Sequence, residues 1–187
     1  MSSGFEVRFA GSGGQGLQLS ARILARATNA EGKHVSSSQS FEPTSRGGLS
    51  RSDLVVGDGQ PDYPLVTALD YLVVLDQIGT EFSTSLLKSG CLVVADERRV
   101  IRPPEGDFDV RMLPLGEVAG SLGNERVMNI IALGVLVEIS GICGMDTLKE
   151  SVWGSVPERF REVNEEALAK GVEAVVGKQV GEGHSVV

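Results

Sequence analysis

The chain has 187 residues, of which 41% are hydrophobic, and a formal net charge of −8. This length suits one domain, or one domain with a helical extension, and the acidity argues against a nucleic-acid binder, which needs a basic face. We expect a cytoplasmic protein that is not embedded in a membrane. The first residues lack the pattern of a signal peptide, and the longest apolar run, residues 130–139, is too short to span a bilayer.

A strand, a glycine turn and a helix are predicted at the beginning of the chain. Apolar residues alternate over residues 5–9, which indicates a strand, and recur at threes and fours over residues 17–28, which indicates a helix. The turn fits the G-x-G-x-x-G pattern and contains the candidate binding residues Gly11, Gly13, Gly14, Gln15 and Gly16. Glycines let the backbone approach a bound group, and a helix N-terminus favours an anion. The same pattern also fits a plain tight turn at the first strand-to-helix junction of any α/β domain.

A short second strand is predicted at residues 34–36, after a helix end at Gly32. A dinucleotide site of the Rossmann type needs an acidic side chain at the tip of this strand, where it holds a ribose hydroxyl. The strand runs instead into the polar residues 36–39, and the nearest acid, Glu31, precedes it. This argues against a nicotinamide or flavin dinucleotide.

A long polar loop is predicted at residues 39–48, where Pro43 and two glycines interrupt any regular pattern. Loops of this length in a compact domain are often functional. Arg46, beside Gly47 and Gly48, offers a guanidinium fork and exposed backbone N–H groups, which together can hold a phosphate or a carboxylate. In the alternative interpretation, Arg46 pairs with a local carboxylate such as Glu42 or Asp53.

The rest of the chain alternates between strands and helices, several of the strands being apolar on both faces, as parallel strands tend to be. Strands are predicted at residues 49–57, 70–76, 90–96 and 107–113, and helices at residues 77–88, 114–122, 126–140, 145–153 and 159–176. The termini, residues 1–4 and 177–187, are expected to be disordered.

Three polar residues in these elements have open roles. Asp76 and Asp96 follow central strands at the edge where ligands collect, but we favour their capping the next element or lying in solvent. Asn129 lies in the helix at residues 126–140, which is apolar all round and therefore packs against the sheet or in a subunit interface. Asn129 either binds a partner or bonds locally.

No catalytic or metal-binding residue is expected in this chain. Cys91 and Cys143 are its only cysteines, and no C-x-x-C occurs, so its thiolates alone cannot ligate an iron–sulfur cluster or a zinc ion. Both lie in apolar surroundings and are interpreted as small buried hydrophobic residues. His34 and His184 are far apart in the sequence, which argues against a histidine-based site.

Taken together, these segments resemble the gamma subunit of 2-oxoacid:ferredoxin oxidoreductases. The resemblance covers residues 5–176 in the expected order and includes the glycine turn, the polar loop, Ser52-Asp53 and the stretch from Asn129 to Gly134. A G-x-G-G-Q-G turn followed about thirty residues later by P-x-x-R-G-G is far more specific than either piece. Asp62-Tyr63-Pro64 and the length favour the 2-oxoglutarate branch. Family members often have Tyr-Gly-Pro-Glu where this chain has Phe41-Glu42-Pro43-Thr44.

The resemblance implies a Rossmann-like α/β domain over residues 5–176, with a mostly parallel sheet flanked by helices and a C-terminal helical extension. It implies one subunit of a complex that oxidatively decarboxylates a 2-oxoacid with coenzyme A, giving an acyl-CoA, carbon dioxide and reduced ferredoxin. The partners would be the alpha, beta and delta subunits, which hold most of the thiamine diphosphate, magnesium and iron–sulfur clusters. This chain would bind no such cofactor alone, and its partner surface could form a homodimer in isolation.

On this interpretation, Gly13, Gly14 and Gln15 form a turn that faces the alpha and beta chains. Arg46, with Gly47 and Gly48, contacts either a partner or an anionic part of coenzyme A. The glycine turn and the Arg46 loop must then share one edge of the sheet. The alternatives are a stand-alone dinucleotide-binding oxidoreductase and a non-enzymatic assembly module.

Overall fold

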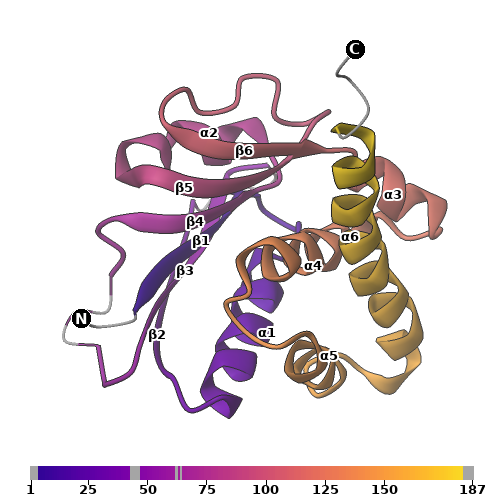
Figure 1. The fold of residues 1–187 in the computed structure, drawn as a ribbon, viewed down its shortest axis with the longest axis horizontal. Coiled ribbons are helices and arrows are strands. Elements are labelled where there is room, and N and C mark those ends of the chain that lie inside the picture. Colours follow the sequence, from indigo (N-terminus) through magenta and orange to yellow (C-terminus); the bar gives the residue numbers. More distant parts are fainter. Residues whose placement is uncertain (1–3, 43–46, 62, 64, 183–187) are drawn as a thin grey trace.

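A six-stranded sheet organises the part of the chain that the computed structural model describes, which is residues 4–42, 47–61, 63 and 65–182. Its strands are β1 (Phe5–Ser12), β2 (His34–Phe41), β3 (Leu49–Gly57), β4 (Leu69–Val74), β5 (Leu87–Asp96) and β6 (Phe108–Leu113). Their order is β2-β3-β1-β4-β5-β6 (Figure 1). Neighbouring strands are parallel in the part β1-β4-β5-β6, whereas β3 pairs antiparallel with both β1 and β2. The predicted α/β fold with a mostly parallel sheet is confirmed.

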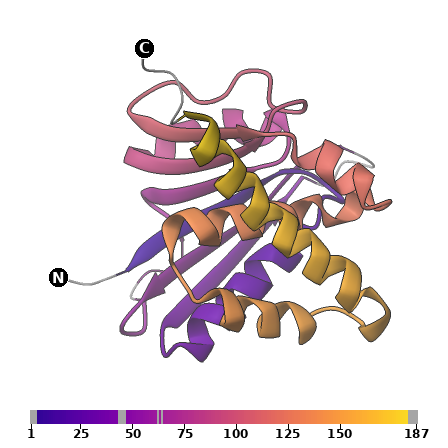
Figure 2. The ribbon, with the colours of Figure 1, turned by 45° about the vertical axis from the view of Figure 1, so that its right-hand side comes forward.

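The helices cover the two faces of the sheet unequally. They are α1 (Leu17–Ala30), α2 (Gln77–Glu81), α3 (Leu115–Ser121), α4 (Met128–Ser140), α5 (Met145–Trp153) and α6 (Arg161–Glu182), with short 3-10 turns η1 (Thr84–Leu86), η2 (Glu125–Val127) and η3 (Glu158–Phe160). Helices α1, α4, α5 and α6 lie on one side of the sheet, and α2 lies on the other (Figures 1 and 2). The larger core therefore forms between the sheet and the four helices.

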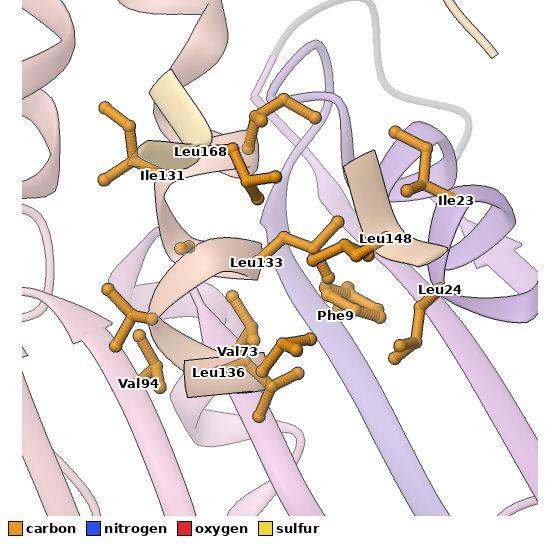
Figure 3. Packing of buried hydrophobic residues seen from close by; sticks show 14 of the residues in the cluster. Phe9, Ile23, Leu24, Val73, Val94, Ile131, Leu133, Leu136, Leu148 and Leu168 are labelled. Carbon is orange, nitrogen blue, oxygen red and sulfur yellow. The ribbon is translucent and has the colours of Figure 1, made fainter. Parts of the chain in front are cut away.

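Helix α4 is the centre of this core. Its residues from Met128 to Val137 are all buried, because the sheet lies on one side of the helix and α6 on the other. Close to the sheet, Leu136 lies near Val73 and Val94, and Leu168 reaches the helix from α6 (Figure 3). The helix is apolar all round because it is enclosed within this chain, so of the two predicted locations the packing against the sheet is confirmed.

Two glycines let α4 and α6 approach each other closely. A Cβ atom on Gly171 would lie 2.3 Å from the carbonyl oxygen of Ile131, and one on Gly134 would lie 2.6 Å from that of Leu168. Real Cβ atoms do not come so close to backbone, so neither position accepts a larger residue unless the helices separate. This contact fixes the distance of α6 from the sheet.

On the opposite face of the sheet, a buried ion pair joins β1 to β3. Arg8 and Asp53 are direct partners in the antiparallel register, and both are less than 10% exposed. Nε and Nη2 of Arg8 each donate to one carboxylate oxygen at 2.8 Å, and Nη1 donates to the carbonyl of Phe82 at 3.0 Å. Such a two-pronged pair offsets part of the cost of burying two charges. Both oxygens of Asp53 accept from Arg8 in this pair.

The predicted loop at residues 39–48 and the predicted helix at residues 77–88 were partly wrong. Strand β2 continues to Phe41 because the backbone of β3 pairs with it along its whole length, although its side chains are mostly polar. Helix α2 ends at Glu81, and β5 already begins at Leu87. Here the Ser83 hydroxyl donates to the carbonyl of Gly79, a local bond that competes with a continuing helix.

The C-terminal helix also differs from expectation. Helix α6 ends at Glu182, so residues 177–182, which were expected to be disordered, are helical. Gly177 and Gly181 lower helix propensity by only about 1 kcal/mol each, which does not by itself end a helix that is already formed. No helix among the described residues is long and apolar enough to cross a membrane.

A glycine in the contact between α4 and α6 and a glycine with free space around it should respond in opposite ways to replacement by alanine. Gly171→Ala should lower the free energy of unfolding by about 1–3 kcal/mol, because the new methyl group forces the helices apart. Gly120→Ala in α3 is the matched control: nothing lies within 4 Å of its added Cβ, and the change should stabilise by about 0.5–1 kcal/mol. Urea denaturation of both variants measures this, and a neutral Gly171→Ala would show that the helices are not held together here.

Candidate functional site

The glycine turn lies at the carboxyl end of β1 and leads directly into α1. Gly14 has φ of 94° and Gly16 has φ of 74°, values that side-chain-bearing residues rarely adopt. Gly13 and Gly14 are exposed, and α1 begins after Gly16 with no side-chain cap among the described residues. The predicted order of strand, turn and helix is confirmed. A helix N-terminus of this kind presents backbone N–H groups and a partial positive charge.

The side chain of Gln15 holds the turn from within. Its Oε1 accepts a hydrogen bond from the backbone N–H of Ser12 at 2.8 Å, and its Nε2 donates to the carbonyl of Leu75 at 2.9 Å. Gly11 is required for this arrangement, because a Cβ there would lie 2.2 Å from Oε1 of Gln15. Gln15 therefore ties the turn to the end of β4, a role that the sequence motif alone did not reveal.

Asn129, at the start of α4, holds the other end of the turn. Its Nδ2 donates to the carbonyl of Gly16 and to Oγ of Ser20, both at 3.0 Å, and Oγ of Ser20 lies 3.3 Å from the carbonyl of Asn129. A Cβ on Gly16 would lie 2.7 Å from Nδ2. Asn129 is 2% exposed, so neither predicted role is correct: it bonds to a distant segment of its own chain.

The β2–β3 hairpin meets the glycine turn at the same edge of the sheet. The backbone N–H of Gly13 donates to the carbonyl of Gly48 at 3.1 Å, which places the two predicted glycine segments side by side. Gly47 is exposed and has φ of 77°. Arg46 lies outside the described residues, and so do Pro43 and Thr44 of the segment that departs from the family pattern.

The two aspartates at this edge are caps, as predicted. Asp76 precedes α2 and accepts from the N–H of Ile78 at 3.3 Å. Asp96 is 1% exposed and accepts from the N–H groups of Arg98, Arg99 and Gly116 at 3.2, 2.9 and 2.7 Å. Both oxygens of Asp96 serve the backbone, so this buried carboxylate is not placed to act on a substrate.

Cys91 and Cys143 are buried free thiols, which agrees with their interpretation as small hydrophobic residues. Burial raises the pKa of each thiol from 9.0 to about 12, with smaller contributions from Asp70 at Cys91 and from Glu31 at Cys143. Both therefore stay protonated and unreactive near neutral pH. The described residues contain no group of three or more His, Cys, Asp or Glu side chains that could hold a metal ion.

The chain is similar to known proteins over almost its whole length. Residues 6–174 match the family described as "Pyruvate ferredoxin/flavodoxin oxidoreductase". The 2-oxoglutarate synthase subunit KorC of Methanocaldococcus jannaschii is 34% identical over 172 residues, which are 90% of this chain and 92% of that protein.

Two solved structures share the fold. The gamma subunit of a keto/oxoacid ferredoxin oxidoreductase from Geobacter sulfurreducens has a TM-score of 0.85 and 33% identity, and covers 94% of this chain and 98% of its own. The 2-oxoglutarate:ferredoxin oxidoreductase of Magnetococcus marinus, solved with 2-oxoglutarate, coenzyme A and succinyl-CoA bound, has a TM-score of 0.81 and 23% identity. It covers 93% of this chain and 31% of the longer one, and at this identity it shows the fold alone.

The hydrogen bonds of Asn129 predict that the turn depends on this side chain. Asn129→Ala leaves the carbonyl of Gly16 and the hydroxyl oxygen of Ser20 without the amide N–H donor they share, so the free energy of unfolding should fall by about 1–3 kcal/mol. Gln18→Ala, an exposed change on the neighbouring helix surface, is the control and should have little effect. If both variants unfold at the same urea concentration as the parent chain, Asn129 does not stabilise the turn.

The buried thiols predict both a labelling result and a pH dependence. Iodoacetamide at pH 8 should modify neither cysteine in the folded chain and both in guanidinium chloride. The unfolded chain loses its thiol protons above about pH 9, whereas the folded chain keeps them up to about pH 12. Folding stability should therefore decrease as the pH rises through this window. Rapid labelling of either cysteine in the folded chain would contradict the burial.

Proposed function

This chain belongs to the pyruvate ferredoxin/flavodoxin oxidoreductase family, and on that basis we propose that it is the gamma subunit of a 2-oxoacid:ferredoxin oxidoreductase. The complex would decarboxylate 2-oxoglutarate oxidatively, giving succinyl-CoA, carbon dioxide and reduced ferredoxin. The choice of 2-oxoglutarate is supported by the relative from Methanocaldococcus jannaschii, which is named 2-oxoglutarate synthase subunit KorC.

The hydrogen bond from Gly13 to Gly48 is the observation that carries this proposal furthest. It brings together the two halves of the composite sequence signature, which are separated by the whole of α1 and β2. Two segments meet at this edge of the sheet. One is the glycine turn, with Gly11, Gly13, Gly14, Gln15 and Gly16, and the other is the end of the β2–β3 hairpin, with Gly47 and Gly48. We propose that this edge, completed by Arg46, holds an anionic part of coenzyme A or of a partner subunit.

The groups at this edge suit anion binding rather than bond making. The exposed backbone of Gly14 and the N-terminus of α1 offer N–H groups and a positive dipole end. A phosphate of coenzyme A would find these donors at the edge, where Asp96 is buried and bonded to backbone N–H groups. The chain would thus orient coenzyme A, and thiamine diphosphate, magnesium and iron–sulfur clusters in the alpha, beta and delta subunits would supply the chemistry of decarboxylation and electron transfer.

A stand-alone dinucleotide-binding oxidoreductase fits the sheet poorly. In the Rossmann arrangement, the second strand lies beside the first, and its tip carries the acid that holds the ribose. Here β3 lies between β1 and β2 and runs antiparallel to both. The end of β2 therefore lies at the same edge as the glycine turn but one strand further from it than in the Rossmann arrangement. A purely passive assembly module would not need the exposed backbone that Gly14 presents at this edge.

Copurification tests the proposal directly. The chain should be isolated by an affinity tag from its native source, and the accompanying subunits identified by mass spectrometry. We expect a thiamine diphosphate-binding chain and chains with iron–sulfur clusters, in a complex that reduces ferredoxin when given 2-oxoglutarate and coenzyme A. A chain that purifies alone and releases a bound nicotinamide or flavin on denaturation would support the stand-alone oxidoreductase instead.

Arg46 has a distinct predicted effect in that complex. Arg46→Ala should raise the KM for coenzyme A roughly 10- to 100-fold, because a charged hydrogen bond to phosphate is lost, and should change kcat less. Arg26→Ala is the control, since this exposed arginine bonds to the carbonyl of Gly154 and lies outside the proposed edge. An Arg46→Ala complex that keeps its subunits and its KM for coenzyme A would remove Arg46 from the site.

A further inference from the structure

A groove with several polar side chains in its lining lies between α1 and the β2–β3 hairpin, beside the glycine turn. It begins at Gly16 and has a volume of about 510 Å³, within the range of small-molecule sites. Its walls include Gln18, Arg22, Ser37, Gln39, Ser52 and Leu54. Helix α1 approaches β2 as well as β3, but Ser37 and Gln39 on this edge strand stay exposed beside it.

The hydroxyl of Ser52 is the feature of this groove that packing does not explain. Ser52 is 1% exposed, and its Oγ has no hydrogen-bond partner among the described residues. It alternates with the buried Leu54 on β3 and is the register partner of Phe9, so it lies on the face of the sheet that α1 covers. A buried hydroxyl without a partner costs stability, so its presence at the floor of a groove points to a ligand that completes its bonding.

The chemistry of the lining selects the ligand. Arg22 is the ionisable residue that lines the groove, and no carboxylate lines it, although the whole chain carries a net charge of −8. The start of α1 adds a positive dipole end. Two amides and several hydroxyls can bond to sugar hydroxyls, while Leu54 and the alanines of α1 present an apolar surface suited to a flat ring.

From these observations we propose that the groove binds a nucleoside phosphate. Its phosphate would lie at Gly16 and the N-terminus of α1, and its ribose would bond to Ser52 and Gln39. Coenzyme A contains a nucleoside phosphate at one end. If the nucleotide that binds is this part of coenzyme A, the inference rests on the proposed function. A free nucleotide presents the same chemistry and would make the groove a separate regulatory site.

The test measures binding to the complex that copurifies with this chain. Adenosine 3′,5′-bisphosphate, AMP and inorganic phosphate are titrated by calorimetry. We expect one of the two nucleotides to bind and phosphate alone to bind far more weakly. Ser52→Ala should weaken nucleotide binding about tenfold, the effect of one hydrogen bond, without lowering the melting temperature, since the hydroxyl has no partner in the chain to lose. Ser37→Tyr fills the groove from the exposed edge strand and should abolish binding.

A matched control uses the other buried hydroxyl without a partner. Thr80 lies in α2, outside the groove, and Thr80→Val should leave nucleotide binding unchanged. Coenzyme A is the source if the bisphosphate raises the KM for coenzyme A, and a free nucleotide is the source if AMP binds without changing that KM. The proposal is overturned if the parent complex binds neither nucleotide, or if Ser52→Ala and Ser37→Tyr bind as the parent does. A complex that binds nucleotide but turns over no 2-oxoacid would refute the proposed function alone.

Discussion

Two amide side chains fix the glycine turn, and the candidate site depends on them. Gln15 bonds across to the end of β4, and Asn129 bonds back from the start of α4 to Gly16. Each amide occupies space that a Cβ on Gly11 or Gly16 would fill, so the glycines and the amides require one another. The turn is therefore a braced junction of β1, β4, α1 and α4, and the direction of the α1 N-terminus follows from it.

Further bonds connect the glycine turn and β1 to the neighbouring β2–β3 hairpin. The hairpin of β2 and β3 is joined to it through Gly13 and Gly48, and β3 is joined to β1 by the buried pair of Arg8 and Asp53. The floor of the groove beside α1 belongs to this same hairpin. The glycine turn and the groove consequently share one rigid frame, in which a ligand could extend from one to the other without rearranging the backbone.

The sequence predicted the strands and helices that have a clear side-chain periodicity. It did not predict features that depend on hydrogen bonds between distant parts of the chain. Strands such as β3 and β5 and the buried helix α4 have apolar patterns that a single chain displays. The length of β2 is not visible in such a pattern, because the backbone of β3 pairs with its polar residues and burial does not select them. The bond from Gln15 to Leu75 joins residues 60 positions apart, and that from Asn129 to Gly16 spans 113, so no local pattern could reveal them.

The distribution of reactive groups explains why such a chain would act only with partners. Its thiols are buried, and both oxygens of the Asp96 carboxylate accept from backbone N–H groups. What the edge of the sheet offers outward is glycine backbone and a helix dipole, which bind and orient but do not transfer protons or electrons. A surface of this kind lowers the entropy cost of bringing a coenzyme to a reaction centre elsewhere. On the proposed function, its contribution to rate is therefore expected to appear in the use of coenzyme A, while the intrinsic chemistry would belong to the other subunits.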